Sequence, residues 1–326
     1  MKRAGRYIGR TFFVLLTAIV LALVFLLGVI LMLEYGPSET ARDLFVKSAM
    51  ESSAGKFLAT GFLGQEKVDE IMQVDEEVET TEVTNTDLVQ IVEREDEDTE
   101  VEDIEIIPVS GTTYKGYVAL VHDPSRVSVG TCGSFGGVGK TVQTMADAAG
   151  ATLAVNGGGF EDTNGSGTGG TPIGIVISEG ELVWGDKNTN YQVIGLDADH
   201  KLIVGYMTGQ EALDANIQYA LSYGPILVVN GEIPDSVAGG SGLNPRSAIG
   251  QTADGTIILI VIDGRQPDSL GASFEDLAQL MLDYGAVNAA NLDGGSSTTL
   301  YYNGEYLNHS SSLVGSRRIP TCILVE

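Results

Sequence analysis

The longest apolar run of the chain lies close to its N-terminus. Residues 12–33 carry no charge, and the four charged residues before them, Lys2, Arg3, Arg6 and Arg10, are all basic. A helix needs about 20 apolar residues to cross the hydrocarbon core, whereas the apolar region of a cleavable signal has about 7–15. The pattern predicts a cytoplasmic tail (1–11), a single-pass membrane anchor (12–33) and, by the positive-inside rule, an extracellular remainder. A cleaved signal is the alternative.

Two polar segments follow the apolar run. Ser38 is a candidate N-cap for a juxtamembrane helix within residues 34–65, and a partner-binding helix in the membrane plane is the weaker alternative. Residues 66–105 contain 18 acidic and two basic side chains and no aromatic residue. Such a segment buries too little apolar surface to offset its ordering entropy. Residues 66–109 are therefore predicted to be a solvated acidic spacer, with a cation-binding arm as the alternative.

Short apolar runs separated by turn residues dominate residues 110–326. One clear helix begins after Ser273, with Asp276 in a capping box, and ends at Gly285. A shorter helix is expected at 139–149. The predicted strands lie at 114–122, 126–130, 151–155, 173–177, 181–184, 192–197, 201–207, 225–229, 247–251, 256–263 and 319–325. Strands outnumber helices, so the fold class is α+β, a twisted, mainly antiparallel sheet with a few packed helices, preceded by one transmembrane helix and an acidic stalk.

Charge and cysteine content exclude two classes of function. The net charge of −26 argues against a nucleic-acid partner, because phosphate binding is driven by cationic surface. The two cysteines and three histidines form no zinc-binding motif. In an exported domain Cys132 and Cys322 could pair, and two buried free thiols are the alternative.

Polar motifs recur where the predicted strands end. Each combines a functional side chain with glycine or another turn residue. The motifs are Asn156-Gly-Gly-Gly-Phe160, Asn244-Pro-Arg-Ser-Ala-Ile-Gly250, Asp263-Gly-Arg265, Asn291-Leu-Asp-Gly-Gly-Ser-Ser297 and Arg317-Arg-Ile-Pro320. Arginines are scarce in this part of the chain, yet Arg246, Arg265, Arg317 and Arg318 all lie in these motifs. Guanidinium groups clamp phosphate or carboxylate in bidentate fashion, so the set indicates an anion site; surface charges and salt bridges are the alternative for any single arginine.

Two further signals are weaker. The stretch from Asp293 to Ser297 also fits a plain turn, because Asp-Gly is a strong turn dipeptide. Asp162 and Asn164 match the first half of a calcium-loop pattern, but the twelfth position is Ile173 instead of glutamate. A flexible loop is favoured there over a metal site, and a divalent cation is kept only as an option.

The ordered series of motifs, together with Pro172-Ile-Gly174, resembles the phosphodiester glycosidase family over roughly residues 110–326. The chain departs from the family pattern at Gly159 and at Ser296, which follows only two glycines. The resemblance implies hydrolysis of a sugar-1-phosphodiester of the N-acetylglucosamine 1-phosphate type, in envelope glycopolymer or exopolysaccharide, with no certain cofactor.

The resemblance also implies roles for individual residues. Asp293 and Asp263 are the catalytic candidates, Asp293 as nucleophile or base and Asp263 as its partner or as the positioner of Arg265. The predicted substrate- and phosphate-binding set is Arg246, Arg265, Arg318, Asn156, Gly157, Gly294, Gly295, Ser296 and Ser297. A non-catalytic polysaccharide-binding module using the same arginines is the alternative function.

Overall fold

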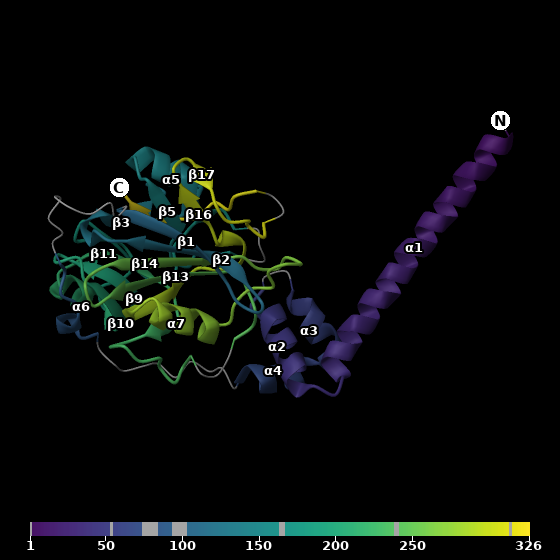
Figure 1. Cartoon of the computed structure of the whole chain (residues 1–326), viewed down its shortest axis with the longest axis horizontal. Coiled ribbons are helices and arrows are strands. Elements are labelled where there is room, and N and C mark those ends of the chain that lie inside the picture. Colours follow the sequence, from purple (N-terminus) through teal and green to yellow (C-terminus); the bar gives the residue numbers. More distant parts are fainter. Residues whose placement is uncertain are drawn as a thin grey trace. The chain divides into compact units, whose positions relative to one another are not determined.

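The computed structural model describes residues 2–52, 55–73, 84–92, 103–162, 167–237, 241–312 and 315–326, and the chain forms two compact units, Met1–Gln73 and Val74–Glu326 (Figure 1). The predicted spacer residues 74–83 and 93–102 and the predicted loop residues 163–166 lie outside the described residues.

The first unit is helical. Its elements are α1 (Lys2–Tyr35), α2 (Glu39–Met50), α3 (Lys56–Leu63) and α4 (Gln65–Gln73). Within α1, Arg10–Tyr35 is long and apolar enough to cross a membrane. Ser38 caps α2 as predicted, its hydroxyl accepting the Ala41 N–H at 3.2 Å. Where one juxtamembrane helix was expected, three short helices form, because Gly64 ends α3 with a φ of 78°.

The second unit is built from three sheets whose strand pairs are all antiparallel within the described residues. The first has the order β1 (Ile104–Ser110), β2 (Lys115–Val121), β14 (Ile257–Ile262), β13 (Arg246–Thr252), β15 (Ala286–Leu292), β12 (Ile226–Val228). The second has the order β10 (Leu202–Thr208), β9 (Asn190–Asp197), β11 (Ile217–Ser222), β7 (Val176–Ser178), β8 (Glu181–Trp184). The third has the order β17 (Glu305–Tyr306), β16 (Leu300–Tyr302), β5 (Leu153–Asn156), β18 (Thr321–Val325), β3 (Val127–Thr131). A small pair joins β4 (Gly137–Val138) to β6 (Gly169–Gly170).

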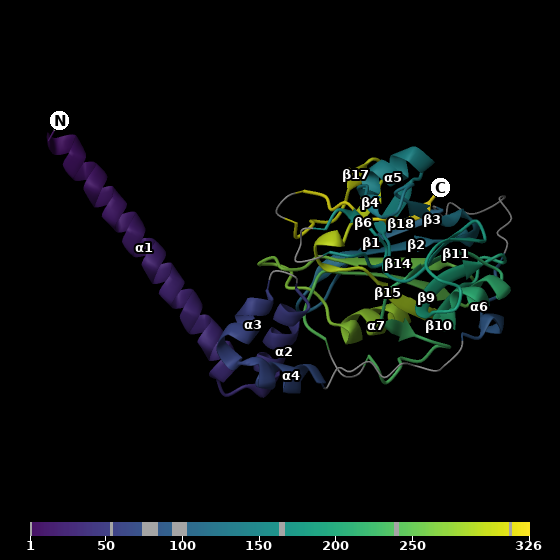
Figure 2. The same cartoon turned by 180° about the vertical axis from the view of Figure 1, so that it is seen from behind.

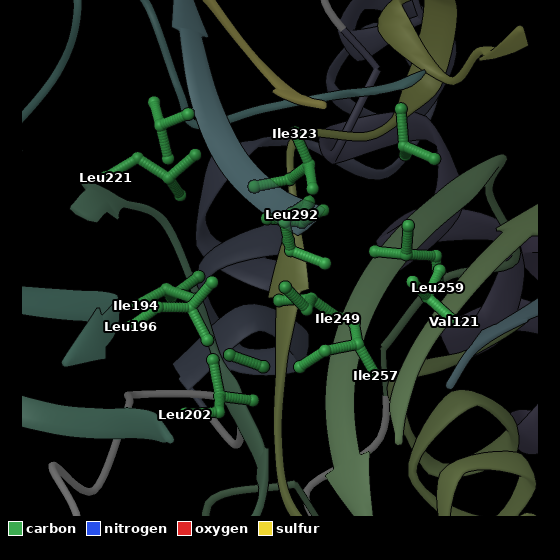
Figure 3. Packing of buried hydrophobic residues seen from close by; sticks show 14 of the residues in the cluster. Val121, Ile194, Leu196, Leu202, Leu221, Ile249, Ile257, Leu259, Leu292 and Ile323 are labelled. Atoms are coloured by element: carbon green, nitrogen blue, oxygen red, sulfur yellow. The ribbon is translucent and has the colours of Figure 1, made fainter. Parts of the chain in front are cut away.

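The three sheets enclose one shared apolar core. Side chains from all of them meet there, including Ile249 of the first sheet, Leu196 of the second and Ile323 of the third (Figure 3). The predicted α+β class with antiparallel strands is therefore confirmed. The strands are divided among three sheets, however, where one twisted sheet was expected.

Each sheet has a helix against its other face. The helix α7 (Phe274–Asp283) packs on the first sheet, α6 (Gly209–Asp214) on the second and α5 (Val142–Ala149) on the third (Figures 1 and 2). The capping box of α7 forms as predicted, with Asp276 N–H on the Ser273 hydroxyl at 3.0 Å. The sequence reading missed α6, which is also closed by a capping box, between Thr208 and Glu211.

Part of the predicted acidic spacer belongs to the second unit. Within residues 84–92, which include the short turn η1 (Thr86–Leu88), the Thr84 hydroxyl donates to the Val204 carbonyl at 2.6 Å and Val89 is buried. The Gln90 N–H donates to the Ala253 carbonyl at 2.8 Å. The strand β1 likewise begins before residue 110, where the sequence boundary was drawn.

Both cysteines are buried free thiols, the second of the two alternatives left open. Cys322 Sγ lies 3.9 Å from Met145 Sδ under α5, in an apolar setting that burial of small hydrophobic residues accounts for.

Candidate active site

Asp293 lies where β15 ends and the chain turns into η4 (Gly295–Ser297). The Gly294 N–H donates to its carboxylate at 3.0 Å, and the hydroxyls of Ser297 and Tyr223 also hydrogen-bond to that carboxylate. The stretch is thus a turn, as the Asp-Gly dipeptide suggested. Several hydrogen-bond donors also fix the carboxylate of Asp293 at this turn. Gly295 takes a φ of 62°, a conformation that glycine adopts without strain.

The environment of Asp293 shifts its ionisation. Loss of hydration raises the pKa of Asp293 to about 6, against the opposing effects of the Ser297, Gly294 and Tyr223 hydrogen bonds and the Arg317 charge. The residue keeps part of its surface exposed although many protein atoms surround its carboxyl. A carboxylate that titrates near 6 suits proton transfer or nucleophilic attack near neutral pH.

A buried amide fixes the backbone of this turn. Asn156, at the end of β5, is fully buried, and its side-chain N–H donates to the Asp293 carbonyl at 2.5 Å. Its side-chain oxygen accepts from the Ser247 hydroxyl at 2.7 Å and the Thr299 N–H at 3.0 Å. The predicted sugar or phosphate contact of Asn156 is not what this arrangement offers. The residue joins three strands to the Asp293 turn instead.

The glycines after Asn156 permit close backbone packing. A Cβ at Gly157 would lie 2.6 Å from Thr321 Oγ1, one at Gly158 2.7 Å from the Ser222 carbonyl oxygen, and one at Gly159 2.7 Å from the Tyr223 ring. The Gly157 carbonyl accepts the Asp293 N–H at 3.0 Å. The run therefore brings Tyr223 up to the site, and Gly157 contributes packing where substrate binding was predicted.

Arg265 lies against the Asp293 turn at Gly295. Its guanidinium donates to Asn244 Oδ1 from Nη2 at 2.8 Å, and a Cβ on Gly295 would lie 3.3 Å from Nη1. The side chain is exposed, and its backbone holds the left-handed region at a φ of 57°. An exposed cation against a glycine turn fits an oxyanion, as predicted for Arg265, Gly294 and Gly295.

The other predicted arginines lie elsewhere. Arg246 is buried: its guanidinium donates to the Ala272 and Gly242 carbonyls at 3.1 and 2.8 Å and stacks 3.9 Å over the Phe274 ring. These contacts hold the loop before α7, and the predicted phosphate contact of Arg246 stays a prediction. Arg318 is exposed and donates to the Gly139 carbonyl at 3.4 Å.

The neighbouring Arg317 was part of the arginine set that indicated an anion site, but it was not among the predicted substrate-binding residues. It pairs with Asp162 at 2.6 Å, with both side chains mostly buried, lies over the Phe160 ring and lowers the pKa of Asp293 through its charge. No feature of the sequence distinguishes Arg317 from the adjacent Arg318 of the same motif. Asp162 also accepts the Gly167 N–H at 3.0 Å, so protein groups hydrogen-bond to its carboxylate. Asn164 lies outside the described residues. Among the described residues, no three acidic, histidine or cysteine side chains form a group that could hold a metal ion.

Asp263, the second catalytic candidate, sits at the end of β14. It is buried, which raises its pKa, and it accepts from Asn308 Nδ2 at 3.2 Å and the His309 N–H at 3.0 Å. Both β14 and β15 pair with β13, so Asp263 and Asp293 lie at one sheet edge, on the order of 10 Å apart by two strand spacings. The contacts make Asp263 an anchor for the 308–309 loop, which also reaches the turn: Ser310 Oγ donates to the Ser296 carbonyl at 3.2 Å.

Comparisons with known proteins point to one family. A model of the phosphodiester glycosidase family matches residues 149–326. The mouse N-acetylglucosamine-1-phosphodiester alpha-N-acetylglucosaminidase is 30% identical over 224 residues, which are 62% of this chain and 42% of the relative. Its human counterpart is 30% identical over 189 residues, 52% of this chain and 36% of the relative. The chain thus spans less than half of the length of these relatives.

Solved structures agree on the fold. The catalytic domain of the zebrafish N-acetylglucosamine-1-phosphodiester alpha-N-acetylglucosaminidase, described as auto-inhibited by its pro-peptide, superposes with a TM-score of 0.60 at 26% identity, covering 73% of this chain and 87% of that one. A putative exported protein from Burkholderia pseudomallei has a TM-score of 0.52 at 17% identity, over 65% of this chain and 74% of that one, which is a likeness of fold alone.

Proposed function

This chain belongs to the phosphodiester glycosidase family, and we propose that it hydrolyses a sugar-1-phosphodiester to the free sugar and a phosphomonoester. The observation that carries the proposal is the Asp293 carboxylate, with a pKa of about 6, on a glycine turn whose Gly295 lies against the exposed guanidinium of Arg265. A glycosyl phosphodiester presents the two groups this arrangement suits: an anomeric carbon that becomes cationic in the transition state, and an anionic phosphate.

In the proposed reaction the bond between the anomeric carbon and the phosphate oxygen breaks. Asp293, ionised above pH 6, either attacks that carbon to give a glycosyl ester that water then hydrolyses, or removes a proton from a water that attacks the carbon directly. Its orientation depends on Ser297 and Tyr223, which donate hydrogen bonds to the carboxylate, and on the Asn156 contact to its backbone. The departing phosphate is a good leaving group that needs no strong general acid, and Arg265 stabilises its negative charge. Arg317 adds positive charge close to Asp293.

We propose further that the second unit acts outside the cell, held at the membrane by α1. The apolar stretch Arg10–Tyr35 supports an anchor, and the basic residues Lys2, Arg3 and Arg6 before it support a cytoplasmic N-terminus. The substrate would then be an envelope glycopolymer or an exopolysaccharide that carries glycosyl phosphodiester bonds. A non-catalytic module that binds such polymers through the same residues is the competing function.

One experiment separates the two functions. The full-length protein, kept in detergent, is incubated with a panel of sugar-1-phosphodiesters, including N-acetylglucosamine 1-(methyl phosphate), and with polymers containing the same linkage. We expect reducing sugar to be released and the Asp293→Asn variant to release at least a hundredfold less, since a positioned carboxylate contributes about 10²–10⁴-fold. Full turnover by Asp293→Asn would refute the assignment of Asp293, and binding without release in the wild type would favour the binding module.

A further inference from the structure

A second concave site lies apart from the Asp293 turn. It is a depression of about 410 Å³, lined by Thr131, Gly133, Phe135, Ser178, Val183 and Trp184. The lining side chains are aromatic, aliphatic or hydroxyl-bearing, and none of them is charged. Depressions of this size with an apolar wall and a few polar groups are typical of sites for small molecules or single units of a polymer.

The aromatic wall of this depression is held in place. The rings of Phe135 and Trp184 meet edge to face with their centroids 5.6 Å apart. The indole Nε1 donates to the Pro172 carbonyl at 3.0 Å, and Pro172 bridges to Phe160, whose ring lies under Arg317. A ring fixed before a ligand arrives loses little entropy on binding. Aromatic faces of this kind carry negative charge density and attract the C–H groups on the apolar face of a pyranose.

A run of backbone contacts connects Thr131 of the depression, in the third sheet, with Asp293 at the end of β15 in the first sheet. Thr131 of β3 pairs with Thr321 of β18, the Thr321 carbonyl accepts the Gly157 N–H at 3.1 Å, and the Gly157 carbonyl accepts the Asp293 N–H at 3.0 Å. Three successive backbone spacings therefore separate Thr131 from Asp293, on the order of 15 Å. That is the span of a few sugar units.

Basic residues lie on the chain segments next to the depression. A Cβ on Gly133 would be 3.7 Å from Lys140 Nζ, which places an ammonium group at the rim of the depression. The backbone N–H and C=O of Lys140 are both hydrogen-bonded to the backbone of Ile319. Ile319 directly follows Arg317 and Arg318 in the chain. Arg317 is paired with Asp162, so Lys140 and the exposed Arg318 are the basic side chains here that can face a phosphate. They suit the phosphates of a chain that runs from the depression to Asp293.

We propose that the depression at Trp184 is a distal glycan-binding site that holds a sugar ring of a phosphate-containing glycan chain while a glycosyl phosphodiester of the same chain lies at Asp293. Phe135 and Trp184 pack against the ring, and Lys140 contacts an adjacent phosphate. This proposal rests on the proposed function for the reaction at Asp293 and adds that the substrate is a chain of several units.

Binding can be followed at this site alone, because Trp184 is the only tryptophan of the protein. The full-length protein in detergent is titrated with an oligomer of N-acetylglucosamine 1-phosphate units, with a neutral N-acetylglucosamine tetrasaccharide and with inorganic phosphate. We expect a saturable change in tryptophan emission with both glycans and none with phosphate. Phe135→Ala should weaken binding about tenfold, the size of an aromatic contact, and Lys140→Gln should weaken only the phosphate-bearing oligomer.

A matched control comes from a second aromatic pair. Tyr301 and Tyr306 also meet edge to face at 5.5 Å, away from the depression's lining residues. Tyr306→Ala should leave the titration unchanged. Ser178→Leu, which fills the depression and keeps both rings, should weaken glycan binding as Phe135→Ala does. The proposal would be overturned if no glycan changed the emission of Trp184. It would also be overturned if the wild type, Phe135→Ala and Ser178→Leu bound glycan with equal affinity.

Turnover gives a separate readout. Phe135→Ala should lower kcat/KM for the oligomer about tenfold and leave kcat/KM for N-acetylglucosamine 1-(methyl phosphate) within about twofold, because only the longer substrate reaches the aromatic pair. Equal losses on both substrates would contradict a distal site. If no substrate is hydrolysed at all, the proposed function fails, whereas the fluorescence titrations still decide whether the depression binds glycan.

Discussion

The raised pKa of Asp293 predicts that a neutral residue at this position stabilises the fold. In the folded protein burial raises the pKa of Asp293 to about 6, from 3.8 for an unperturbed aspartate. The folded state therefore binds its proton more tightly than the unfolded chain does. Stability from this group is complete below pH 3.8 and is lost as the pH rises through about 6. Asp293→Asn removes this pH-dependent loss.

The size of the effect follows from the shift. One pKa unit corresponds to about 1.4 kcal/mol, so a shift of roughly two units corresponds to about 3 kcal/mol at pH 8. Part of Asp293 is exposed, and solvent screening lowers this figure toward about 1–2 kcal/mol. An asparagine oxygen can still accept the Gly294 N–H, and the Ser297 and Tyr223 hydroxyls can accept as well as donate. The variant should thus gain stability at pH 8 and differ little from the wild type at pH 4.

Chemical denaturation of the full-length protein measures this gain. Emission of Trp184 reports on the second unit alone, since it is the only tryptophan. Asp268→Asn serves as the control, because its ion pair with Lys115 lowers the pKa of Asp268 and the sign should reverse at neutral pH. A variant Asp293→Asn that is less stable than the wild type at pH 8, or equally stabilised at pH 4 and pH 8, would refute the desolvation argument.

Three further predictions concern Asn156, the two arginines Arg265 and Arg246, and the cysteines. Asn156→Ala removes three buried hydrogen bonds, so denaturation should show a loss of about 2–4 kcal/mol, and kcat should fall with it; an unchanged unfolding midpoint would contradict the network. Arg265→Ala should weaken inhibition by a non-hydrolysable phosphodiester about tenfold or more with little change in stability, whereas Arg246→Ala should unfold more easily; the reverse pattern would restore Arg246 to the phosphate site. Cys132 and Cys322 should both react with a thiol reagent in denaturant without prior reduction, and two unreactive thiols would reveal a disulfide.

Much of the fold was readable from local patterns. The Ser273 capping box and the Ser38 cap depend on neighbouring residues only, and each forms as predicted. The short apolar runs predicted as strands form strands as well, but β11 and β15 were not predicted. The division of the strands into three sheets around one core depends on long-range pairing, which no local pattern encodes. The helix α6 was missed although its own capping box, Thr208 to Glu211, was a usable signal.

The candidate site was predictable as a set of motifs but not as a set of roles. Asp293 and Arg265 remain its centre. Asn156 had the right residue type for a ligand contact, and only its burial shows that it acts on the backbone. Tyr223 carried no motif at all, because it reaches Asp293 through packing against the glycine run. The choice between Arg317 and Arg318 depends on which side chain points inward, a matter of tertiary structure.

The central claim is that a glycosyl phosphodiester is cleaved at its anomeric carbon with the help of Asp293. Hydrolysis of N-acetylglucosamine 1-(methyl phosphate) by the full-length protein in ¹⁸O-labelled water tests it directly, with mass spectrometry of both products. We predict ¹⁸O in the released sugar, none in methyl phosphate, and no product above background with Asp293→Asn. Label in the phosphate would show cleavage of the phosphorus–oxygen bond and contradict the proposed mechanism, and absence of hydrolysis by the wild type across the substrate panel would contradict the function itself.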